Sequence, residues 1–327
     1  MHKRRLNEWT LEMIIEPNGP ILIKSGEESG ADPTLPDMNF VRTRHPRSGE
    51  RTVYLPGSSL KGMLRSHAER IIRTVHGESS EICCDPLHKN RSCGTRTQDI
   101  KDTAQQYKAL CLACRMFGHT VQASHLYIAD AYPSQAIDQL PIRHQVAIDR
   151  LSGGVAVGPF ELEVAQTGRF QTQLTLINFE RWQLGLLALA LRDLSEGRLL
   201  LGYGKSRGLG RVKARFGRLE IAYPGRLDAE GLATAIFGVG ALAPDLVGVY
   251  GYVPEDQGPL PAGGMLMTDS ITWGRPVVRF GALGDEPLSE LTDDVLVAAH
   301  GQVSQVLAAM VRAWSDYRPS HQEGRDG

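Results

Sequence analysis

The most informative stretch of the sequence is LGYGKSRGLG, residues 201–210, in which four of the ten residues are glycine. Glycine has no Cβ, so this backbone can adopt positive φ and approach another backbone closely, while Lys205 and Arg207 add two cations. A Rossmann or Walker phosphate loop precedes a helix, whereas this tract follows a predicted helix and precedes a predicted strand. Both nucleotide-binding interpretations therefore fail. A loop that grips an extended polyanion and a glycine-rich turn with solvated cations both remain open.

The elements around this tract predict an α+β fold. Helical periodicity and alternating apolar runs indicate two helices and four strands. In chain order they are a strand at 8–16, a helix that starts within 56–59 and ends at Gly77, strands at 125–131 and 170–177, a helix at 181–194 and a strand at 209–223. This order, β-α-β-β-α-β, is that of the ferredoxin-like (RRM-type) fold.

The predicted core, residues 1–224, carries three insertions. Residues 25–49 are rich in Gly, Pro, Asp and Ser and predict a long loop, which in a compact domain is usually functional or disordered. Residues 81–118 hold every cysteine of the chain. Residues 140–165 predict a long hairpin that turns at 152–154, where the sequence is Ser-Gly-Gly.

Two further regions follow the core. Residues 225–317 predict an extension of mixed structure that ends in a helix at 293–314, and residues 318–327 predict a disordered tail. The composition, 42% hydrophobic and 22% charged over 327 residues, is typical of a globular protein with a sizeable core. No apolar run approaches the ~20 residues that span a bilayer, and residues 1–10 lack the apolar stretch of a signal peptide. We therefore expect a cytoplasmic protein that makes no use of a membrane.

The charge is distributed unevenly along the chain. The net charge is only −1, but residues 42–73 hold eight Lys and Arg against two acids, whereas residues 219–300 hold three Arg against twelve acids. One part of the surface is suited to a polyanion and another to water or a basic partner.

The start of the first predicted helix is a candidate anion site. Its sequence places Ser58 or Ser59 at the N-cap, with Lys61 and Arg65 four residues apart on one face. Free backbone N–H groups and the helix dipole favour an anion at such a position. Gly62 lowers helix stability by ~1 kcal/mol relative to Ala, which suggests that another group approaches closely there. An ordinary capped helix with a solvated lysine is the alternative.

The cysteines predict a metal site. The five cysteines lie within 32 residues: Cys83, Cys84, Cys93, Cys111 and Cys114. Cys111 and Cys114 have the C-x-x-C spacing that lets two thiolates bind one tetrahedral ion, and Cys93 with one of the adjacent pair would complete a four-cysteine site. His88 is a weaker candidate ligand. We expect a structural Zn²⁺, because nothing indicates an open coordination position, and a thioredoxin-like redox pair would need a βαβ setting.

Four motifs in order resemble one family. They are LPGSSLKG at 55–62 followed by Arg65, CRMFG at 114–118, IDR at 148–150 with two glycines at 153–154, and the glycine-rich tract at 202–210. Together they resemble the RAMP superfamily of CRISPR proteins, and within it the backbone subunit of type III effector complexes, the Cas-seven family in its Csm and Cmr branch. The resemblance covers about residues 13–223, and the acidic stretch beyond 225 matches no motif of the family.

The resemblance implies a filament of subunits along a CRISPR RNA, with other copies or other Cas subunits as neighbours. Ser58, Ser59, Lys61 and Arg65, with Lys205 and Arg207 of the glycine-rich loop, would then lie against the guide phosphates. The hairpin would be the thumb that separates guide from target RNA at regular intervals. The residues of the hairpin agree with that role. Its apolar side chains are candidates to insert between bases, and Arg143, His144 and Arg150 are candidates to contact the RNA backbone. A surface hairpin held by its own packing is the alternative.

The resemblance also implies chemistry. In catalytic members an Asp in the loop after the first strand supports metal-dependent cleavage of the target RNA, and Asp37 stands at that place, with Asp32 in reserve. A carboxylate there could hold Mg²⁺ or a similar divalent cation at the scissile phosphate. The loop lacks the glycine-rich lead-in of the family, and an Asx turn is the alternative. Of the adjacent cysteines, Cys84 is favoured as the zinc ligand because its Cys-Asp-Pro context resembles zinc-bearing members of the III-D and III-E type.

Three other functions remain open. The chain could be a purely structural guide-binding subunit, or an endoribonuclease that processes the CRISPR RNA with a histidine base and no metal. The histidines available for that reaction are His45, His67, His119, His125 and His144, and the sequence pairs none of them. A zinc-containing metabolic enzyme would require a deep apolar pocket, for which the sequence offers no constellation.

Overall fold

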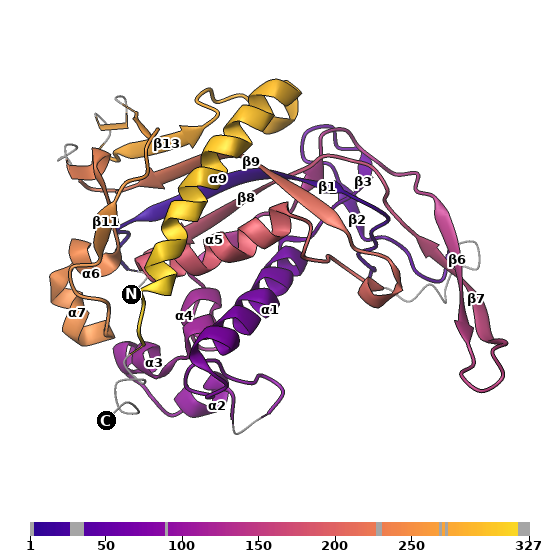
Figure 1. Ribbon diagram of the computed structural model, residues 1–327, viewed down its shortest axis with the longest axis horizontal. Helices are drawn as coiled ribbons and strands as arrows, with labels where there is room; N and C mark the ends of the chain where they lie inside the picture. The colour runs from indigo at the N-terminus through magenta and orange to yellow at the C-terminus, as the bar shows by residue number, and fades with distance from the viewer. Residues whose placement is uncertain are drawn as a thin grey trace.

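The computed structural model describes residues 3–26, 36–88, 91–226, 231–267, 270–271 and 274–319. It is a mixed α/β structure built on one antiparallel sheet with strand order β12-β13-β9-β1-β8-β4, in which β5 also pairs with β8 (Figure 1). The strands of this sheet are β1 (Glu8–Pro17), β4 (Leu126–Ile128), β5 (Tyr132–Pro133), β8 (Phe170–Ile177), β9 (Val212–Ala222), β12 (Met265–Leu266) and β13 (Val277–Gly281).

The central strand β1 lies between β8 and β9 and buries one apolar face, formed by Trp9, Leu11, Met13 and Ile15. Leu11 faces Leu174 of β8 and Leu219 of β9 in the register, and all three are fully buried. A bulge between Glu12 and Met13 shifts the pairing with β9 by one residue. The predicted strand at 8–16 is thus confirmed, and the strand at 170–177 has the predicted bounds.

Helices α1 (Gly57–His76) and α5 (Arg181–Ser195) pack side by side against the sheet, and α9 (Asp293–Ser315) packs along α5 (Figure 1). Gly185 of α5 permits that approach, since a Cβ there would lie 2.7 Å from the backbone nitrogen of Trp314. Further along, α9 crosses the edge of β9, where His300 Nδ1 accepts the N–H of Phe216 at 3.0 Å. Burial, aided by Arg215, lowers the pKa of His300 and so keeps Nδ1 an acceptor.

Helix α9 bears on the expectation that no segment of the chain spans a membrane. Within the described residues it is the one helix with the length and composition of a membrane-spanning segment. However, Val303, Leu307 and Met310 are buried in the main hydrophobic core. The helix therefore packs on the domain through one face, with 33% of its apolar window buried.

The insertions are more structured than the sequence suggested. The loop predicted at 25–49 contains β2 (Arg42–Arg44), which pairs with β3 (Arg51–Val53), and the strand predicted at 125–131 is reduced to β4. Helices α2 (Cys93–Thr97), α3 (Thr103–Ala109) and α4 (Leu112–Phe117) build the cysteine-bearing insertion. The hairpin of β6 (Ile142–Ile148) and β7 (Val155–Glu163) is confirmed and projects from one end of the molecule (Figure 1).

The region after residue 225 shares the sheet and the core with the rest of the chain. Its strand β13 pairs with β9, and its helix α9 lies on α5. Its other elements are the 3-10 turns η4 (Gly231–Ala233) and η5 (Leu288–Glu290), strands β10 (Ala235–Phe237) and β11 (Gln257–Pro259), which pair with each other, and helices α6 (Val239–Leu242) and α7 (Pro244–Tyr250). Helix α7 contacts the cysteine insertion, where Lys108 Nζ donates to the Gly248 carbonyl at 2.7 Å. Of the predicted tail, residues 318–327, only 318 and 319 belong to the described residues.

Candidate nucleic-acid interface and metal centre

The glycine-rich loop between α5 and β9 is shaped by its packing against residues 20–23. All four of its glycines have positive φ, between +68° and +95°. A Cβ on Gly202 would lie 2.2 Å from the Leu22 carbonyl oxygen, and Tyr203 N–H donates to that same oxygen at 2.7 Å. Gly210 similarly donates to the Pro20 carbonyl at 2.9 Å. These two glycines therefore serve close backbone contact, which the sequence had indicated as one use of the tract.

The two cations of this loop lie on its surface. Lys205 and Arg207 bound the 3-10 turn η3 (Lys205–Arg207), and both are exposed. The Arg207 guanidinium lies 5.0 Å from the ring centroid of Tyr203 and donates to its hydroxyl at 2.8 Å. The loop thus presents one lysine that extends to solvent and one arginine that is held over an aromatic ring.

The start of α1 differs from the prediction. The N-cap is Pro56, and neither serine caps the helix; Ser58 and Ser59 lie in its first turn. The cap is tertiary, since the Gly57 N–H donates to Asp130 Oδ1 at 2.7 Å. This carboxylate already occupies part of the positive helix terminus, so an anion would be bound mainly by side chains along the helix.

Gly62 also differs from the expectation of a close contact. No described atom lies within 4 Å of a Cβ built on this residue. Gly62 instead opens onto a groove of about 600 Å³ that lies between α1, residues 23–24 and the glycine-rich loop.

This groove brings together two sequence motifs that are more than 130 residues apart. Ser59 and Lys205, from the sequence candidates, both line it. Three further cations line it that the sequence reasoning missed: Lys24, Arg70 and Arg198, all exposed. The lining therefore holds four cations and no acidic side chain.

The sequence spacing of the groove-lining residues of α1 could have predicted one of these cations, Arg70. Ser59, Ser66 and Arg70 follow one another at seven and four residues, so they form one stripe of the helix, and all three line the groove. Lys61 lies off this stripe and is partly buried; burial first, and Arg65 second, lower the pKa of its ammonium. Lys24 and Arg198 carry no such signal, because tertiary packing alone places them there.

A histidine–aspartate pair adjoins the groove. His67 Nε2 lies 2.7 Å from Asp193 Oδ2. Burial alone would raise the pKa of Asp193, but the hydrogen bonds from His67 and Arg192 outweigh it and hold that pKa low. The other ring nitrogen of His67 is buried and has no hydrogen-bond partner among the described residues. Neither nitrogen is therefore available as a base for a substrate in the groove.

Arg65 lies at the cysteine insertion instead of on the groove. Its guanidinium donates to Glu69 Oε1 and to the Gly118 carbonyl, both at 2.9 Å. It also donates to Cys114 Sγ at 3.4 Å. The sequence predicted that Lys61 and Arg65 share one face of the helix. The structure does not place them in one site, because Arg65 is bound to the cysteine insertion.

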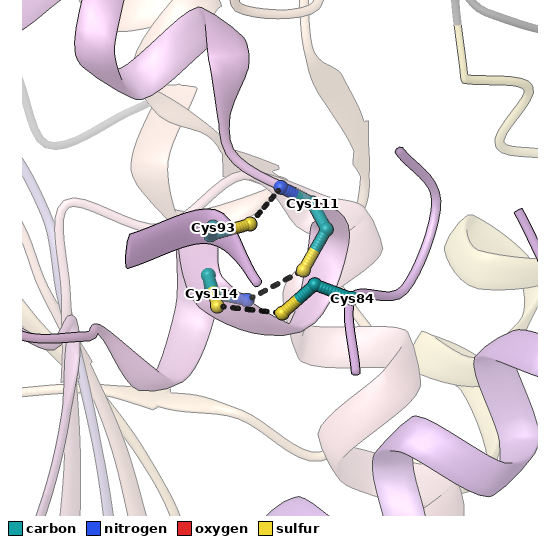
Figure 2. Close-up of side chains that lie close together, drawn as sticks. All are labelled: Cys84, Cys93, Cys111 and Cys114. Atoms are coloured by element: carbon teal, nitrogen blue, oxygen red, sulfur yellow. Dashed lines mark hydrogen bonds between the residues drawn. The ribbon is translucent and has the colours of Figure 1, made fainter. Parts of the chain in front are cut away.

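The structure brings four cysteines together, as Figure 2 shows. They are Cys84, Cys93, Cys111 and Cys114, all buried, and their sulfur atoms all lie within 4.8 Å of one another. Backbone N–H groups of Cys111 and Cys114 point at Sγ of Cys93 and of Cys111, at 3.3 and 3.5 Å. These four cysteines are close enough to hold a metal ion such as zinc.

The adjacent cysteine behaves differently. Cys83 Sγ lies 3.8 Å from the Glu69 carbonyl oxygen, outside the cluster. Burial raises the pKa of Cys83 to about 12, so it remains a thiol. Within the cluster, hydrogen bonds from the neighbouring thiols lower the pKa of Cys84, whereas the same contacts, followed by burial, raise that of Cys114. Binding of a metal ion requires the four cysteines as thiolates, which the cation itself stabilises.

The hairpin of β6 and β7 exposes an unusual number of apolar side chains. Leu151 at its tip is 98% exposed. Five more are 45–61% exposed: Ile142, Val146, Ile148, Val155 and Val157. Arg143, His144 and Arg150 are also exposed, and His144 Nδ1 lies 3.8 Å from Glu161 Oε1. An isolated hairpin gains nothing from exposing such residues, so this one has the composition of an interaction surface.

The candidate carboxylates lie near the base of this hairpin. Asp37 is exposed, and its Oδ2 accepts the Glu161 N–H of β7 at 2.9 Å. Neighbouring Met38 forms a bridge to Leu162, so the segment that carries Asp37 is attached to the hairpin. Asp32 lies outside the described residues.

Comparison with known families places this chain. The family model described as "RAMPs: RAMP superfamily" matches residues 15–213, more than half of the sequence. The chain belongs to the RAMP superfamily. The matched span runs from β1 to the start of β9 and so includes α1, the cysteine cluster, the hairpin and the glycine-rich loop. The region after β9 lies outside the RAMP match.

No curated protein matches the sequence. Among solved structures, the chain is similar to one described as "Type IV-B CRISPR Complex", with 19% sequence identity and a TM-score of 0.43. The alignment covers 64% of this chain and 90% of that one.

Proposed function

We propose that this RAMP protein is a guide-RNA-binding backbone subunit of a type III CRISPR effector complex. The observation that carries the proposal is the groove in which α1 and the glycine-rich loop meet, with four cations and no acid in its lining. RNA backbone is the extended polyanion that such a groove suits, and contacts with phosphates hold it without regard to sequence. The type III assignment rests on the motif resemblance.

We also propose that the core is ferredoxin-like. The four strands that correspond to the predicted core strands lie in the order β9-β1-β8-β4, with α1 between β1 and β4 and α5 between β8 and β9 in the chain. This order supports the β-α-β-β-α-β interpretation. The sheet face beneath η5 is closed by ion pairs, such as Arg218 with Glu12 at 2.9 Å, and is therefore a poor platform for stacked bases.

The groove proposal is tested by the salt dependence of RNA binding. For a single strand, log K falls with log salt by ~0.7 per neutralised phosphate. Lys205→Ala should therefore weaken binding of an unstructured RNA and lower the slope by about that amount. Lys101→Ala is the matched control, because Lys101 is an exposed lysine of the cysteine insertion and does not line the groove. Unchanged affinity and slope in Lys205→Ala would refute the assignment of the groove.

The hairpin is proposed to insert between guide and target RNA. Its exposed apolar residues support that role, since apolar side chains can wedge between base steps. Target cleavage at the base of the hairpin is the finer part of the proposal, with Asp37 as the carboxylate that holds a divalent ion. Asp37→Asn should abolish cleavage of a complementary RNA while guide binding persists; cleavage that survives both in this variant and in Asp32→Asn would refute a catalytic role for these two carboxylates.

The four-cysteine cluster is proposed to hold a structural Zn²⁺. Its residues fit the ion: four buried sulfur donors, no carboxylate ligand, and backbone N–H groups directed at sulfur. Adjacent cysteines provide the test. Cys84→Ala should remove the zinc from the purified protein, whereas Cys83→Ala should retain one zinc per chain. Retention of stoichiometric zinc by Cys84→Ala would contradict the proposed ligand set.

A further inference from the structure

Two arginines reach the sulfur atoms of the cysteine cluster from different elements. Arg96 of α2 donates through Nη2 to Cys93 Sγ at 3.1 Å. Arg65 of α1 donates through Nη2 to Cys114 Sγ at 3.4 Å. A guanidinium is always charged and only donates, so in each contact the sulfur is the acceptor of a charge-assisted hydrogen bond.

Other hydrogen bonds fix both guanidiniums. Arg96 also donates to the carbonyls of Ser80 and Ala109, at 2.8 and 2.9 Å. Arg65 also donates to the Gly118 carbonyl and to Glu69. The four partners lie before, within and after the cysteine-bearing helices and on α1. Each arginine is therefore held in place independently of the sulfur that it contacts, which is the arrangement of a pre-organised donor.

The charges of the site balance when these arginines are included. Four thiolates around a divalent ion carry a net charge of −2, which is unfavourable in a buried site. Arg65 and Arg96 contribute two positive charges next to the sulfurs. Glu69, which contacts Arg65, is also within 3.7 Å of Arg73, so its charge has a separate counterion. The whole cluster is thus neutral with a divalent ion bound.

We propose that Arg65 and Arg96 are positioning residues of the metal site, which hold the sulfurs of Cys114 and Cys93 in place, as hydrogen-bond acceptors, for a divalent cation. This inference deepens the zinc proposal and rests on it. It also assigns Arg65 to the metal centre in place of the guide phosphates that the motif resemblance implied. Because Arg65 belongs to α1, one helix contributes both to the groove and to the metal site.

The test compares Arg65→Met and Arg96→Met with the unaltered chain. Zinc affinity is measured by competition with a chromophoric chelator, and the sulfur environment is measured by the absorption spectrum of the Co²⁺-loaded protein. Each substitution should weaken zinc binding by ~10–100-fold. It should also move the sulfur-to-cobalt charge-transfer band to longer wavelength, because a thiolate that loses a hydrogen bond is a better electron donor. Lys101→Met removes one exposed charge from the same insertion and should change neither quantity.

The possible outcomes distinguish this inference from the zinc proposal and from the RNA-binding proposal. Unchanged zinc affinity and an unchanged cobalt spectrum in both Met variants would overturn it, provided that the unaltered chain binds the metal. An unaltered chain that binds neither ion overturns the zinc proposal as well. If a Met variant does not fold, Arg65→Lys or Arg96→Lys, which keeps the charge and a donor, should show an intermediate affinity. Arg65→Met should leave the salt slope of RNA binding unchanged; a reduced slope with normal metal binding would assign Arg65 to RNA instead.

Discussion

Two glycines of the glycine-rich loop permit a controlled measurement of close backbone packing. Gly202 and Gly208 have the same φ, +83°. A Cβ on Gly202 would lie 2.2 Å from the Leu22 carbonyl oxygen, whereas a Cβ on Gly208 meets nothing within 4 Å. Alanine at either position is strained by the positive φ, and only at residue 202 does it also introduce a collision.

The expected magnitudes follow from this geometry. Positive φ lowers the stability of an alanine variant by ~1–2 kcal/mol, so Gly208→Ala should lose about that amount. In Gly202→Ala the Cβ lies ~1 Å inside a normal carbon–oxygen contact, and relief of the collision separates Tyr203 from the Leu22 carbonyl. Loss of that hydrogen bond adds ~1–3 kcal/mol. Gly202→Ala should therefore be the less stable variant by ~2 kcal/mol.

Urea denaturation of the two variants provides the measurement. The midpoint of Gly202→Ala should lie well below that of Gly208→Ala, with similar slopes, because the surface exposed on unfolding does not change. RNA affinity should fall in Gly202→Ala, since Gly202 lines the groove. Equal midpoints for the two variants would refute the reasoning, because they would show that the Leu22 carbonyl does not restrict residue 202.

The remaining predictions concern pH, the metal and the hairpin. Burial raises the pKa of Glu180 to about 7, above its ordinary value of 4.5. Between these two values the folded state holds a proton that the unfolded state releases. The stability of the protein should therefore fall as the pH rises from 4.5 through 7. Glu180→Gln should remove up to ~3 kcal/mol of this pH-dependent loss of stability. Urea denaturation of the variant and of the unaltered chain at pH 5 and pH 8 provides the measurement. The same loss between the two pH values in both proteins would contradict the raised pKa of Glu180. Prolonged chelation should lower the melting temperature of the unaltered chain and of Cys83→Ala alike, and leave Cys84→Ala unaffected, as calorimetry would show. Leu151→Ala should change stability by less than ~0.5 kcal/mol, yet reduce the fluorescence of 2-aminopurine placed in the target opposite the hairpin.

Local sequence signals predicted the elements that depend on local patterns. The strand at 170–177 and the helix from 181 owe their form to alternation and to an apolar helical run, and both were predicted almost to the residue. The same holds for the hairpin, where the turn residues and the flanking alternation agree. Strand β2 was missed because it has three residues, two of them arginine, and forms only by pairing with β3.

The parts of the site that were mispredicted depend on contacts between distant residues. A serine N-cap for α1 was a reasonable local prediction, but Asp130 supplies the cap from 73 residues away. Lys24 and Arg198 join the groove through the packing of residues 22–24 against the glycine-rich loop. Arg65 was assigned by its place in a motif, whereas its partners Gly118 and Cys114 become neighbours only when the insertion folds onto α1.

The margins of the sheet restrict how copies of this protein can associate. Strand β9 would be exposed along its outer side, but β13 pairs with its second half and His300 accepts the Phe216 N–H. The sheet then ends on β12, which has two residues, and on β4, which has three. Short edge strands of this kind are poor templates for the addition of a strand from another chain, so they oppose aggregation through backbone pairing. In the proposed filament, growth would then be governed by side chains and by the length of the bound RNA.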